Sequence, residues 1–382
     1  MTRILISICL FCIWISVAAQ QPLSKEQAIQ IGDQLWTEYL QKLKPEANQA
    51  WEERGIRSGD FFAKIKGHIS GGKPIDGRSL YISLHGGGNA PAEVNDQQWH
   101  NQADLYAPKE GVYVALRAPT NTWNLWHENH VDEILDSLIR YMAILHDVNL
   151  NKVYVMGYSA GGDGVYQLAP RMADRWAAAS MMAGHPGDAV AENLRNLPFA
   201  IFMGGKDNPY DRNKWAEVWR VKLDSLQKID PKAYTHQVTV YPDLPHWMER
   251  RDTVAVDWMA QYVRNPLPDK VVWIQDDRLH THAYWLQARD KVAKVGDKAV
   301  VSIDGNEISI HENTYTELYI NLNDRLLDLD KPVLVKQRGE ILFNGKLTRR
   351  ESILQATFNT YRDPNLLFSS RLVIRGNQVK IL

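Results

Sequence analysis

Residues 153–164, VYVMGYSAGGDG, change character in the middle of the segment. The first half is a nearly continuous apolar run, which is typical of a buried β-strand, and small residues follow it. Within the segment, GYSAG matches the pattern G-x-S-x-G and places Ser159 at the turn. A strand that turns sharply into a helix strains the serine backbone and exposes its hydroxyl, so bulky neighbours would clash. The segment therefore predicts a strand–turn–helix unit with Ser159 as a candidate nucleophile.

Around this segment, residues 79–268 alternate regularly between short apolar runs and helix-like segments. The apolar runs are residues 80–84, 112–116, 153–156, 177–182, 199–203 and 238–241, and the helix-like segments include residues 131–146, 164–176, 212–227 and 252–263. Such alternation is typical of an α/β domain whose mainly parallel, doubly wound sheet is covered by helices on both faces. In such sheets the binding site lies at the carboxyl ends of the strands. Residues that directly follow the apolar runs are therefore the candidates for chemistry.

The glycine-rich segment HGGG, residues 85–88, directly follows the first of these predicted strands. Glycines let the backbone fold so that amide groups point toward a developing oxyanion. A phosphate-binding loop would need a Walker lysine or the pattern G-x-G-x-x-G at the start of a helix, and this segment has neither. We therefore expect an oxyanion hole formed by the backbone amides of Gly86 or Gly87 and of Ala160, the residue after the candidate nucleophile.

A nucleophilic serine needs a base, and the base needs a carboxylate that orients it. Asp207 and His246 each lie shortly after a predicted strand, and the chain order is Ser159, Asp207, His246. This order, with each residue at a strand end, is the one expected for a serine nucleophile on a mainly parallel sheet. The sequence thus predicts His246 as the general base and Asp207 as its orienting acid.

Three other residues compete for these roles. Asp243 lies three residues before His246, and Asp211 lies four residues after Asp207. Asp207 is preferred because it alone immediately follows a strand. His185 follows another predicted strand and could either line the binding site or be a solvated loop histidine.

The segments HGGG, GYSAGG, GGKDN and LPHW, in this order, resemble those of α/β-hydrolase esterases. The chain is most similar to exported esterases grouped with poly(3-hydroxybutyrate) depolymerases and with feruloyl and acetylxylan esterases, over roughly residues 79–265. This resemblance implies Ser159 as the nucleophile, His246 as the general base and Asp207 as its orienter. It also implies an oxyanion hole made by the amides of Ala160 and of Gly86 or Gly87.

Aromatic residues cluster in the loop that follows the apolar run 112–116. Trp123, Trp126 and His127 lie in the segment APTNTWNLWHENH, and Tyr158 adjoins the candidate nucleophile. Aromatic faces suit stacking on a sugar ring or on an aromatic acyl group, so we expect these four residues to bind substrate. In the alternative interpretation, the tryptophans pack the loops into place.

Residues 1–19 have the pattern of an export signal. Arg3 precedes an apolar run that is too short to span a bilayer, and small residues lie directly before the expected cleavage site after Ala19. The protein is therefore expected to be secreted or periplasmic, without a membrane attachment once the signal is removed. Its only cysteines, Cys9 and Cys12, lie in this segment, so we expect neither a cysteine nucleophile nor disulfides in the mature protein.

The pattern changes on both sides of the predicted α/β domain. Residues 20–78 predict an amphipathic helix that ends at Pro45, followed by a polar lead-in. Residues 269–382 contain short alternating runs joined by glycine-containing turn pairs, which are typical of β-hairpins. We interpret this last part as a smaller, mostly β module with one helix near residues 351–360.

Composition and charge narrow the class of partner. The chain has 44 basic and 45 acidic residues and no basic run, so nothing favours nucleic acid or an anionic membrane surface as a partner. The segment HENH at residues 127–130 lacks the spacing that places two histidines on one helix face toward a metal. We therefore expect neither a metal nor a cofactor, and the sequence gives no indication of oligomeric state.

The leading hypothesis is an exported serine hydrolase that cleaves carboxylic esters through an acyl-enzyme intermediate. Its substrate would be a small-molecule or polymer ester, with plant polysaccharide esters and polyesters as the candidates. One alternative is a serine peptidase of the prolyl-oligopeptidase type, which shares the order of the three residues. The other is a binding protein on a hydrolase scaffold that has lost catalysis.

Overall fold

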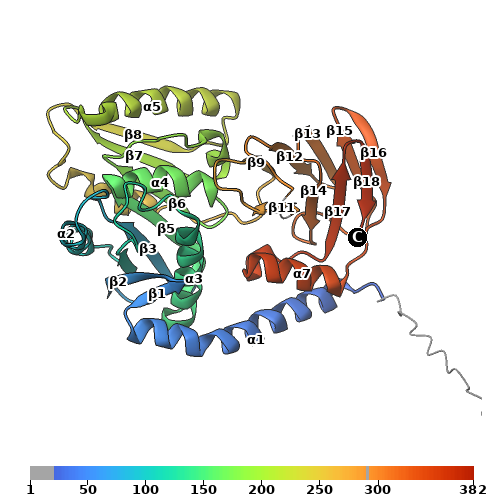
Figure 1. The fold of residues 1–382 in the computed structure, drawn as a ribbon. Helices are drawn as coiled ribbons and strands as arrows, with labels where there is room; N and C mark the ends of the chain where they lie inside the picture. Colours follow the sequence, from blue (N-terminus) through green and yellow to red (C-terminus); the bar gives the residue numbers. More distant parts are fainter. Residues whose placement is uncertain (1–20, 290–291) are drawn as a thin grey trace, which may run out of the picture.

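A mainly parallel eight-stranded sheet forms the centre of the N-terminal part of the protein (Figure 1). The computed structural model describes residues 21–289 and 292–382, so the predicted export signal lies outside the described residues. The strand order is β1-β2-β4-β3-β5-β6-β7-β8. Strands β3 to β8 are all parallel, whereas β2 pairs antiparallel with both β4 and β1 at one edge. The strands are β1 (Gly55–Ser58), β2 (Phe61–Ser70), β3 (Arg78–Leu84), β4 (Gly111–Leu116), β5 (Val148–Tyr158), β6 (Ala178–Met182), β7 (Phe199–Gly204) and β8 (His236–Tyr241).

Helices cover both faces of this sheet, because successive side chains of a buried strand point to opposite sides. In β5, Val153 and Val155 belong to a cluster with buried residues of α3, α4 and α5, whereas Tyr154 and Met156 belong to a cluster with α2 and α6. The helices are α1 (Lys25–Glu52), α2 (Ala92–Ala103), α3 (Asn129–His146), α4 (Ala160–Arg171), α5 (Arg212–Ile229) and α6 (Val254–Met259). The predicted α/β class and doubly wound sheet are thus confirmed.

The C-terminal part is mostly β, as predicted, and contains two five-stranded sheets. Their orders are β10-β11-β14-β17-β18 and β16-β15-β13-β12-β9, and α7 (Glu351–Tyr361) packs beside the first of them. The strands are β9 (Lys270–Ile274), β10 (His282–Ala283), β11 (Leu286–Ala288), β12 (Lys298–Asp304), β13 (Glu307–Asn313), β14 (Leu318–Leu322), β15 (Val333–Gln337), β16 (Glu340–Gly345), β17 (Ser370–Arg375) and β18 (Gln378–Ile381).

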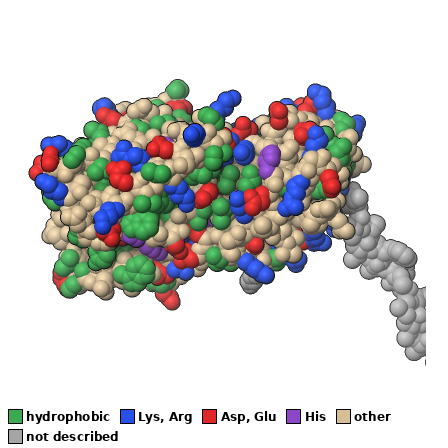
Figure 2. All heavy atoms as spheres, turned by 90° about the horizontal axis from the view of Figure 1, so that it is seen from above, with side chains coloured by type: hydrophobic (Ala, Val, Ile, Leu, Met, Phe, Trp, Pro, Cys, Tyr) green, Lys and Arg blue, Asp and Glu red, His purple; other side chains and the backbone are tan. Residues whose placement is uncertain are grey.

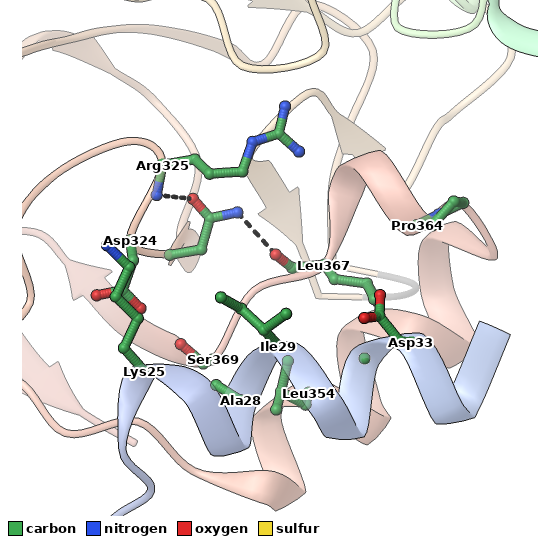
Figure 3. Close-up of a pocket in the computed structure, with 12 residues that line it drawn as sticks. Lys25, Ala28, Ile29, Asp33, Asp324, Arg325, Leu354, Pro364, Leu367 and Ser369 are labelled. Atoms are coloured by element: carbon green, nitrogen blue, oxygen red, sulfur yellow. Dashed lines mark hydrogen bonds between the residues drawn. The ribbon is translucent and has the colours of Figure 1, made fainter. Parts of the chain in front are cut away.

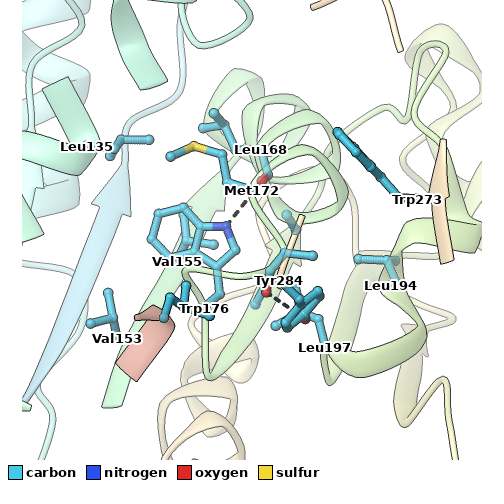
Figure 4. Close-up of a cluster of buried hydrophobic side chains, with 14 of the residues drawn as sticks. Leu135, Val153, Val155, Leu168, Met172, Trp176, Leu194, Leu197, Trp273 and Tyr284 are labelled. Carbon is cyan, nitrogen blue, oxygen red and sulfur yellow. Dashed lines mark hydrogen bonds between the residues drawn. The ribbon is translucent and has the colours of Figure 1, made fainter. Parts of the chain in front are cut away.

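The hydrophobic core is continuous between the two parts (Figure 4). Trp273 and Tyr284 of the C-terminal part lie near Leu194 and Leu197, which belong to the segment between β6 and β7. The Tyr284 hydroxyl donates to the carbonyl of Ala173, 2.9 Å away. The C-terminal part is therefore packed against the sheet domain by buried apolar contact, not attached by a linker alone.

Two expectations for residues 20–78 need correction. The first helix does not end at Pro45 but continues to Glu52, because the residues beyond the proline are packed: Ala47 is fully buried, and Glu46 accepts a hydrogen bond from Tyr141 of α3. Moreover, β1 and β2 belong to the main sheet, so the sheet begins at Gly55 and not at residue 79. In β2 only Ala63 and Ile65 are buried, so this segment lacks the continuous apolar run of a central strand.

Helix α1 spans both parts of the molecule (Figure 1). Its C-terminal half packs on α3 and its N-terminal half packs on α7. Between α1 and the C-terminal part lies a cavity of about 230 Å³, with Ala28 and Leu354 in its apolar lining and Asp33, Asp324 and Arg325 around it (Figure 3). The helix thus connects the two parts along one side.

Within residues 21–289 and 292–382, no helix combines the length and the apolar composition that crossing a bilayer requires. On the face shown in Figure 2, acidic and basic side chains are interspersed and do not gather into areas of one sign.

Candidate active site

Ser159 lies at the sharp turn between β5 and α4, as predicted. Its backbone has φ 58° and ψ −122°, and its amide donates to the carbonyl of Met182 on the neighbouring strand, 2.9 Å away. A Cβ on Gly157 would lie 2.3 Å from the carbonyl oxygen of Gly161, and one on Gly161 would lie 2.0 Å from that of Leu84. Because the turn leaves no space for side chains there, glycines are needed on both sides of the serine.

The structure brings the three predicted residues Ser159, His246 and Asp207 into one hydrogen-bonded series. His246 Nε2 lies 3.0 Å from Ser159 Oγ, and its Nδ1 lies 2.7 Å from Asp207 Oδ2. Asp207 is completely buried after β7, whereas the His246 side chain, after β8, is 40% exposed. A carboxylate at Nδ1 keeps the proton on that nitrogen, which leaves Nε2 free to accept the serine proton.

The alternative residues do not take part in this series. Asp243 is 94% exposed and approaches only Lys206, at 3.8 Å, and Asp211 pairs with Lys214 at 2.7 Å. His185 faces the same cavity as Ser159, so of its two predicted interpretations the structure favours a lining residue.

Tyr158 supports the histidine and does not face the cavity as expected. The residue is buried, its hydroxyl donates to the carbonyl of His246 at 2.7 Å, and the same hydroxyl accepts from the amide of Met248 at 3.0 Å. Both contacts fix the loop that carries His246. The expectation of a substrate contact at Tyr158 is therefore replaced by a supporting role.

The glycine-rich segment lies directly against the nucleophile. A Cβ on Gly86 would lie 3.0 Å from the Cβ of Ser159, while Gly87 has φ +109° and lines the cavity. In the described part of the chain, neither the amide of Gly87 nor that of Ala160 has a hydrogen-bond acceptor. Two unpaired amides beside a serine hydroxyl are suited to bind an oxyanion.

Two residues that the sequence did not single out hold this segment in place. Asn95 of α2 accepts from the amide of Gly88 at 2.8 Å and is buried, so the third glycine amide is already occupied. His85 accepts at Nε2 from the amide of Ala118 and therefore donates at Nδ1 to the carbonyl of Gly86. Burial lowers the pKa of His85 to about 4, which keeps it neutral.

A cavity of about 300 Å³ opens above Ser159. It is lined by Gly87, Gly88, Asn89, Trp123, Ser159, Ala160, Asp163, His185, Tyr210 and Arg212. Trp123 and Tyr210 are exposed at 70% and 76%, so their rings are accessible to a ligand. Of the predicted substrate residues Trp123, Trp126, His127 and Tyr158, only Trp123 lines this cavity.

Trp126 and His127 do not line the cavity but pack against neighbouring residues. Trp126 is only 1% exposed and donates to the carbonyl of His85, 3.0 Å away, so it supports the glycine-rich segment. His127 lies beside Trp123, with ring centroids 5.6 Å apart, and burial lowers its pKa to about 4. The alternative interpretation, in which the loop aromatics pack the loop into place, thus describes Trp126 correctly.

Asp163 and Arg212 are charged residues of the cavity that sequence reasoning missed. Asp163 accepts from the amide of His185 at 2.6 Å, and burial raises the pKa of its carboxyl to about 6. Arg212 Nη1 lies 3.7 Å from Asp207 Oδ1, and its guanidinium lies over the ring of Tyr210. Asp163 could have been found, because it follows Ser159 by four residues and so shares its side of the helix.

No group of three or more histidine, aspartate or glutamate side chains with a metal-binding arrangement occurs among the described residues.

Part of the chain is similar to known hydrolases. The model of the dienelactone hydrolase family matches residues 103–264, and no curated protein sequence gives a significant match. Similar solved structures include a thermostable esterase (16% identity, 55% of this chain and 62% of that chain, TM-score 0.40) and a ferulic acid esterase (13%, 54% and 95%, TM-score 0.38). A carboxylesterase from Mesorhizobium loti is similar at 17% identity over 54% of this chain and 99% of that chain, with TM-score 0.37. The chain has the α/β-hydrolase fold; the narrower resemblance to depolymerases and feruloyl or acetylxylan esterases stays a prediction.

Proposed function

We propose that this protein is a serine hydrolase that cleaves carboxylic esters through an acyl-enzyme intermediate. The observation that carries the proposal is the hydrogen-bonded series Ser159–His246–Asp207 beside two unpaired amides. A serine, a base and an orienting carboxylate in this geometry are the parts that nucleophilic acyl transfer requires.

In the first half of the reaction, Ser159 Oγ forms a bond to the ester carbonyl carbon while His246 Nε2 takes the hydroxyl proton. The carbonyl oxygen becomes an oxyanion, which the amides of Gly87 and Ala160 stabilise. The bond to the alcohol oxygen then breaks, and the imidazolium returns its proton to that oxygen, so the alcohol leaves. Asp207 keeps its negative charge throughout and stabilises the imidazolium.

In the second half, water takes the place of the alcohol. His246 Nε2 accepts a proton from the water as its oxygen bonds to the acyl carbon. The bond to Ser159 Oγ breaks, and the proton passes from the imidazolium back to the serine. The products are a carboxylic acid and the regenerated enzyme.

A fluorophosphonate probe tests the nucleophile, because it phosphonylates an activated serine. We expect labelling of the wild type and no labelling of Ser159→Ala. Ser225→Ala is the matched control, since Ser225 is an exposed serine of α5 far along the chain from the site. Equal labelling of the wild type and Ser159→Ala would contradict the proposal.

For the substrate, we propose an ester of a plant polysaccharide or a polyester. The exposed rings of Trp123 and Tyr210 in the cavity support a ligand with a sugar ring or an aromatic acyl group. Turnover should be compared for acetylated xylan, methyl ferulate, a hydroxybutyrate oligomer and an aryl acetate, with an aminoacyl anilide as the peptidase control. Preference for the anilide would replace the esterase proposal by the peptidase alternative.

We also propose export, with cleavage after Ala19, on the pattern of residues 1–19. The test is expression with the full N-terminal sequence, followed by fractionation and N-terminal sequencing. Recovery from the periplasm or medium with Gln20 as the first residue is expected, whereas an intact Met1 in the cytoplasm would contradict export.

A further inference from the structure

The loop of residues 117–128, termed here the Trp123 loop, contacts both the cavity above Ser159, termed the substrate cavity, and the glycine-rich residues 85–88, termed the oxyanion segment. Trp123 lines the cavity, and Trp126 donates to the carbonyl of His85 at 3.0 Å. A Cβ on Gly88 would lie 3.2 Å from the carbonyl oxygen of Trp123, so the loop rests directly against the glycines. The position of this loop therefore affects both the cavity wall and the oxyanion segment.

The end of the Trp123 loop is held by the C-terminal part of the chain. Arg278, between β9 and β10, donates from Nε to the carbonyl of His127 at 2.9 Å, and its Nη2 lies 3.9 Å from the carboxylate of Glu128. The amide of Arg278 in turn donates to Asp276 Oδ1 at 2.9 Å. The contact with Asp276 holds the backbone of Arg278, and the side chain extends from there to the Trp123 loop.

A second contact of the same segment reinforces this arrangement. His280 Nε2 lies 2.8 Å from one oxygen of Asp132, and the other oxygen accepts from Arg171 at 2.6 Å. Arg171 is the last residue of α4, the helix that begins after the nucleophile, and it also donates to the His127 carbonyl at 3.4 Å. The carbonyl of His127 is thus held by one guanidinium from each part of the protein.

We propose that Arg278 is a positioning residue through which the C-terminal part sets the substrate cavity. It holds the Trp123 loop so that Trp123 stays over the cavity and the loop stays against the oxyanion segment. The consequence for turnover rests on the proposed esterase function, whereas the consequence for the loop does not. Arg278 touches neither substrate nor the reacting atoms, so it acts through His127.

The C-terminal part has other anchors, so loss of the Arg278 side chain should not detach it. Tyr284 donates to Ala173, and the Asn193 side chain both donates to and accepts from the backbone of Ile274. Buried apolar residues of both parts share one core. The variant therefore separates positioning of the loop from docking of the C-terminal part.

The experiment compares Arg278→Ala and Arg278→Lys in the full chain. Lys270→Ala is the matched control, because Lys270 forms an ion pair with Asp230 at 3.2 Å across the same interface without touching the Trp123 loop. The first readout is hydrogen exchange of peptides covering residues 117–128. The second is kcat and KM for methyl ferulate and for an aryl acetate, with thermal unfolding recorded for each variant.

For Arg278→Ala we expect exchange in the loop to be faster by about 10-fold. We expect KM for methyl ferulate to rise about 10-fold as Trp123 moves. We expect kcat for the small acetate to change less than about 2-fold, because Asn95 and His85 still hold the oxyanion segment. Arg278→Lys should recover most of both effects because it keeps one donor for the carbonyl, and Lys270→Ala should match the wild type. If Arg278→Ala exchanges and turns over like Lys270→Ala, the proposal is wrong.

Absence of esterase activity in the wild type would overturn the proposed function but would leave the exchange readout decisive for Arg278. If Arg278→Ala does not fold, Arg278→Met, which keeps the apolar stem, takes its place, and the same two outcomes decide.

Discussion

Ser159 adopts φ 58° and ψ −122°, angles that cost a non-glycine residue about 1–3 kcal/mol. The cost is borne because the amide is bonded to Met182 and because glycines at positions 157 and 161 leave the turn free of clashes. This requirement is local, and a five-residue pattern can express it fully. The place of Ser159 at this turn was therefore predictable from sequence, as were the places of His246 and Asp207, which follow from the order of strand ends.

Residues that reach the cavity from separate elements were not predictable in the same way. Arg212 is the first residue of α5 and lies only five residues after Asp207, but nothing in the local pattern shows that its side chain turns toward that carboxylate. Trp126 was predicted to bind substrate but is buried, since a tryptophan in a loop beside the cavity can point into the core. Nothing in its local pattern distinguishes it from Trp123, which points into the cavity.

The choice of Asp207 over its rivals can be tested by removing each charge. Asp207→Asn keeps the shape of the side chain but disfavours the Nδ1–H tautomer of His246, so we expect kcat to fall about 10³- to 10⁴-fold at neutral pH. Asp243→Asn and Asp211→Asn should change kcat less than about 2-fold, because both residues are exposed and the carboxylate at His246 Nδ1 is that of Asp207. A loss of activity in either of these variants, with Asp207→Asn active, would reassign the acid.

The raised pKa of Asp163 makes the free energy of unfolding decrease as the pH rises. A carboxyl group whose pKa is about 6 in the folded state, against about 4 in an unfolded chain, binds its proton more tightly when folded. The contribution of this group to the free energy of unfolding is most favourable below pH 4 and is lost as the pH rises through 6. Asp163→Asn can still accept from His185 but does not ionise.

We therefore expect the free energy of unfolding of Asp163→Asn, relative to the wild type, to rise between pH 4 and pH 7. The gain should be about 1–2 kcal/mol, less than the full shift implies, because the residue is partly exposed. Urea unfolding at a series of pH values measures it. A difference that does not vary with pH would show that Asp163 has an ordinary pKa.

At the scale of elements, the central strands were predictable because buried parallel strands are continuous apolar runs. The edge strands β1 and β2 and the helix α2 were missed. In β2 only Ala63 and Ile65 are buried, so its sequence lacks a continuous apolar run, and α2 is mostly polar around its four buried residues, Asn95, Trp99, Gln102 and Ala103. Such elements are stabilised by neighbours that are distant in sequence, so their own residues carry a weak pattern.

Pro45 provides a test of tertiary stabilisation of a helix. The proline has no amide hydrogen, so the carbonyl of Gln41 lacks its intrahelical partner, yet α1 continues to Glu52. Pro45→Ala should therefore raise the free energy of unfolding by about 1–3 kcal/mol. Lys44→Ala, at the neighbouring exposed position, is the control and should change it by less than about 0.5 kcal/mol. A lower stability of Pro45→Ala would mean that the helix needs a bend at this position.

At the scale of the whole molecule, the sheet domain and the C-terminal part are joined by buried ion pairs as well as by apolar contact. Arg264 bonds to Asp363 at 2.6 Å, to Asn151 at 2.8 Å and to the carbonyl of Asp174 at 2.6 Å. These partners are spread over more than half of the chain. No sequence pattern relates them, which is why the interface could not be predicted.

Arg264→Ala should lower the free energy of unfolding by about 3–5 kcal/mol, because it leaves the carboxylate of Asp363 buried without its partner. Arg57→Ala removes a surface pair with Glu53 and should cost only about 0–1 kcal/mol. Chemical unfolding of both variants makes the comparison. Similar losses in the two variants would show that the buried network does not hold the two parts together.

The connecting helix α1 has a consequence for biosynthesis. It precedes the other described elements in the chain, but α7, on which its N-terminal half packs, lies roughly 300 residues later. During translation the helix can contact α3 early, whereas half of its apolar face has no partner until almost the whole chain has been synthesised. A chain truncated before residue 351 would lack α7, so the N-terminal half of α1 would stay without this partner.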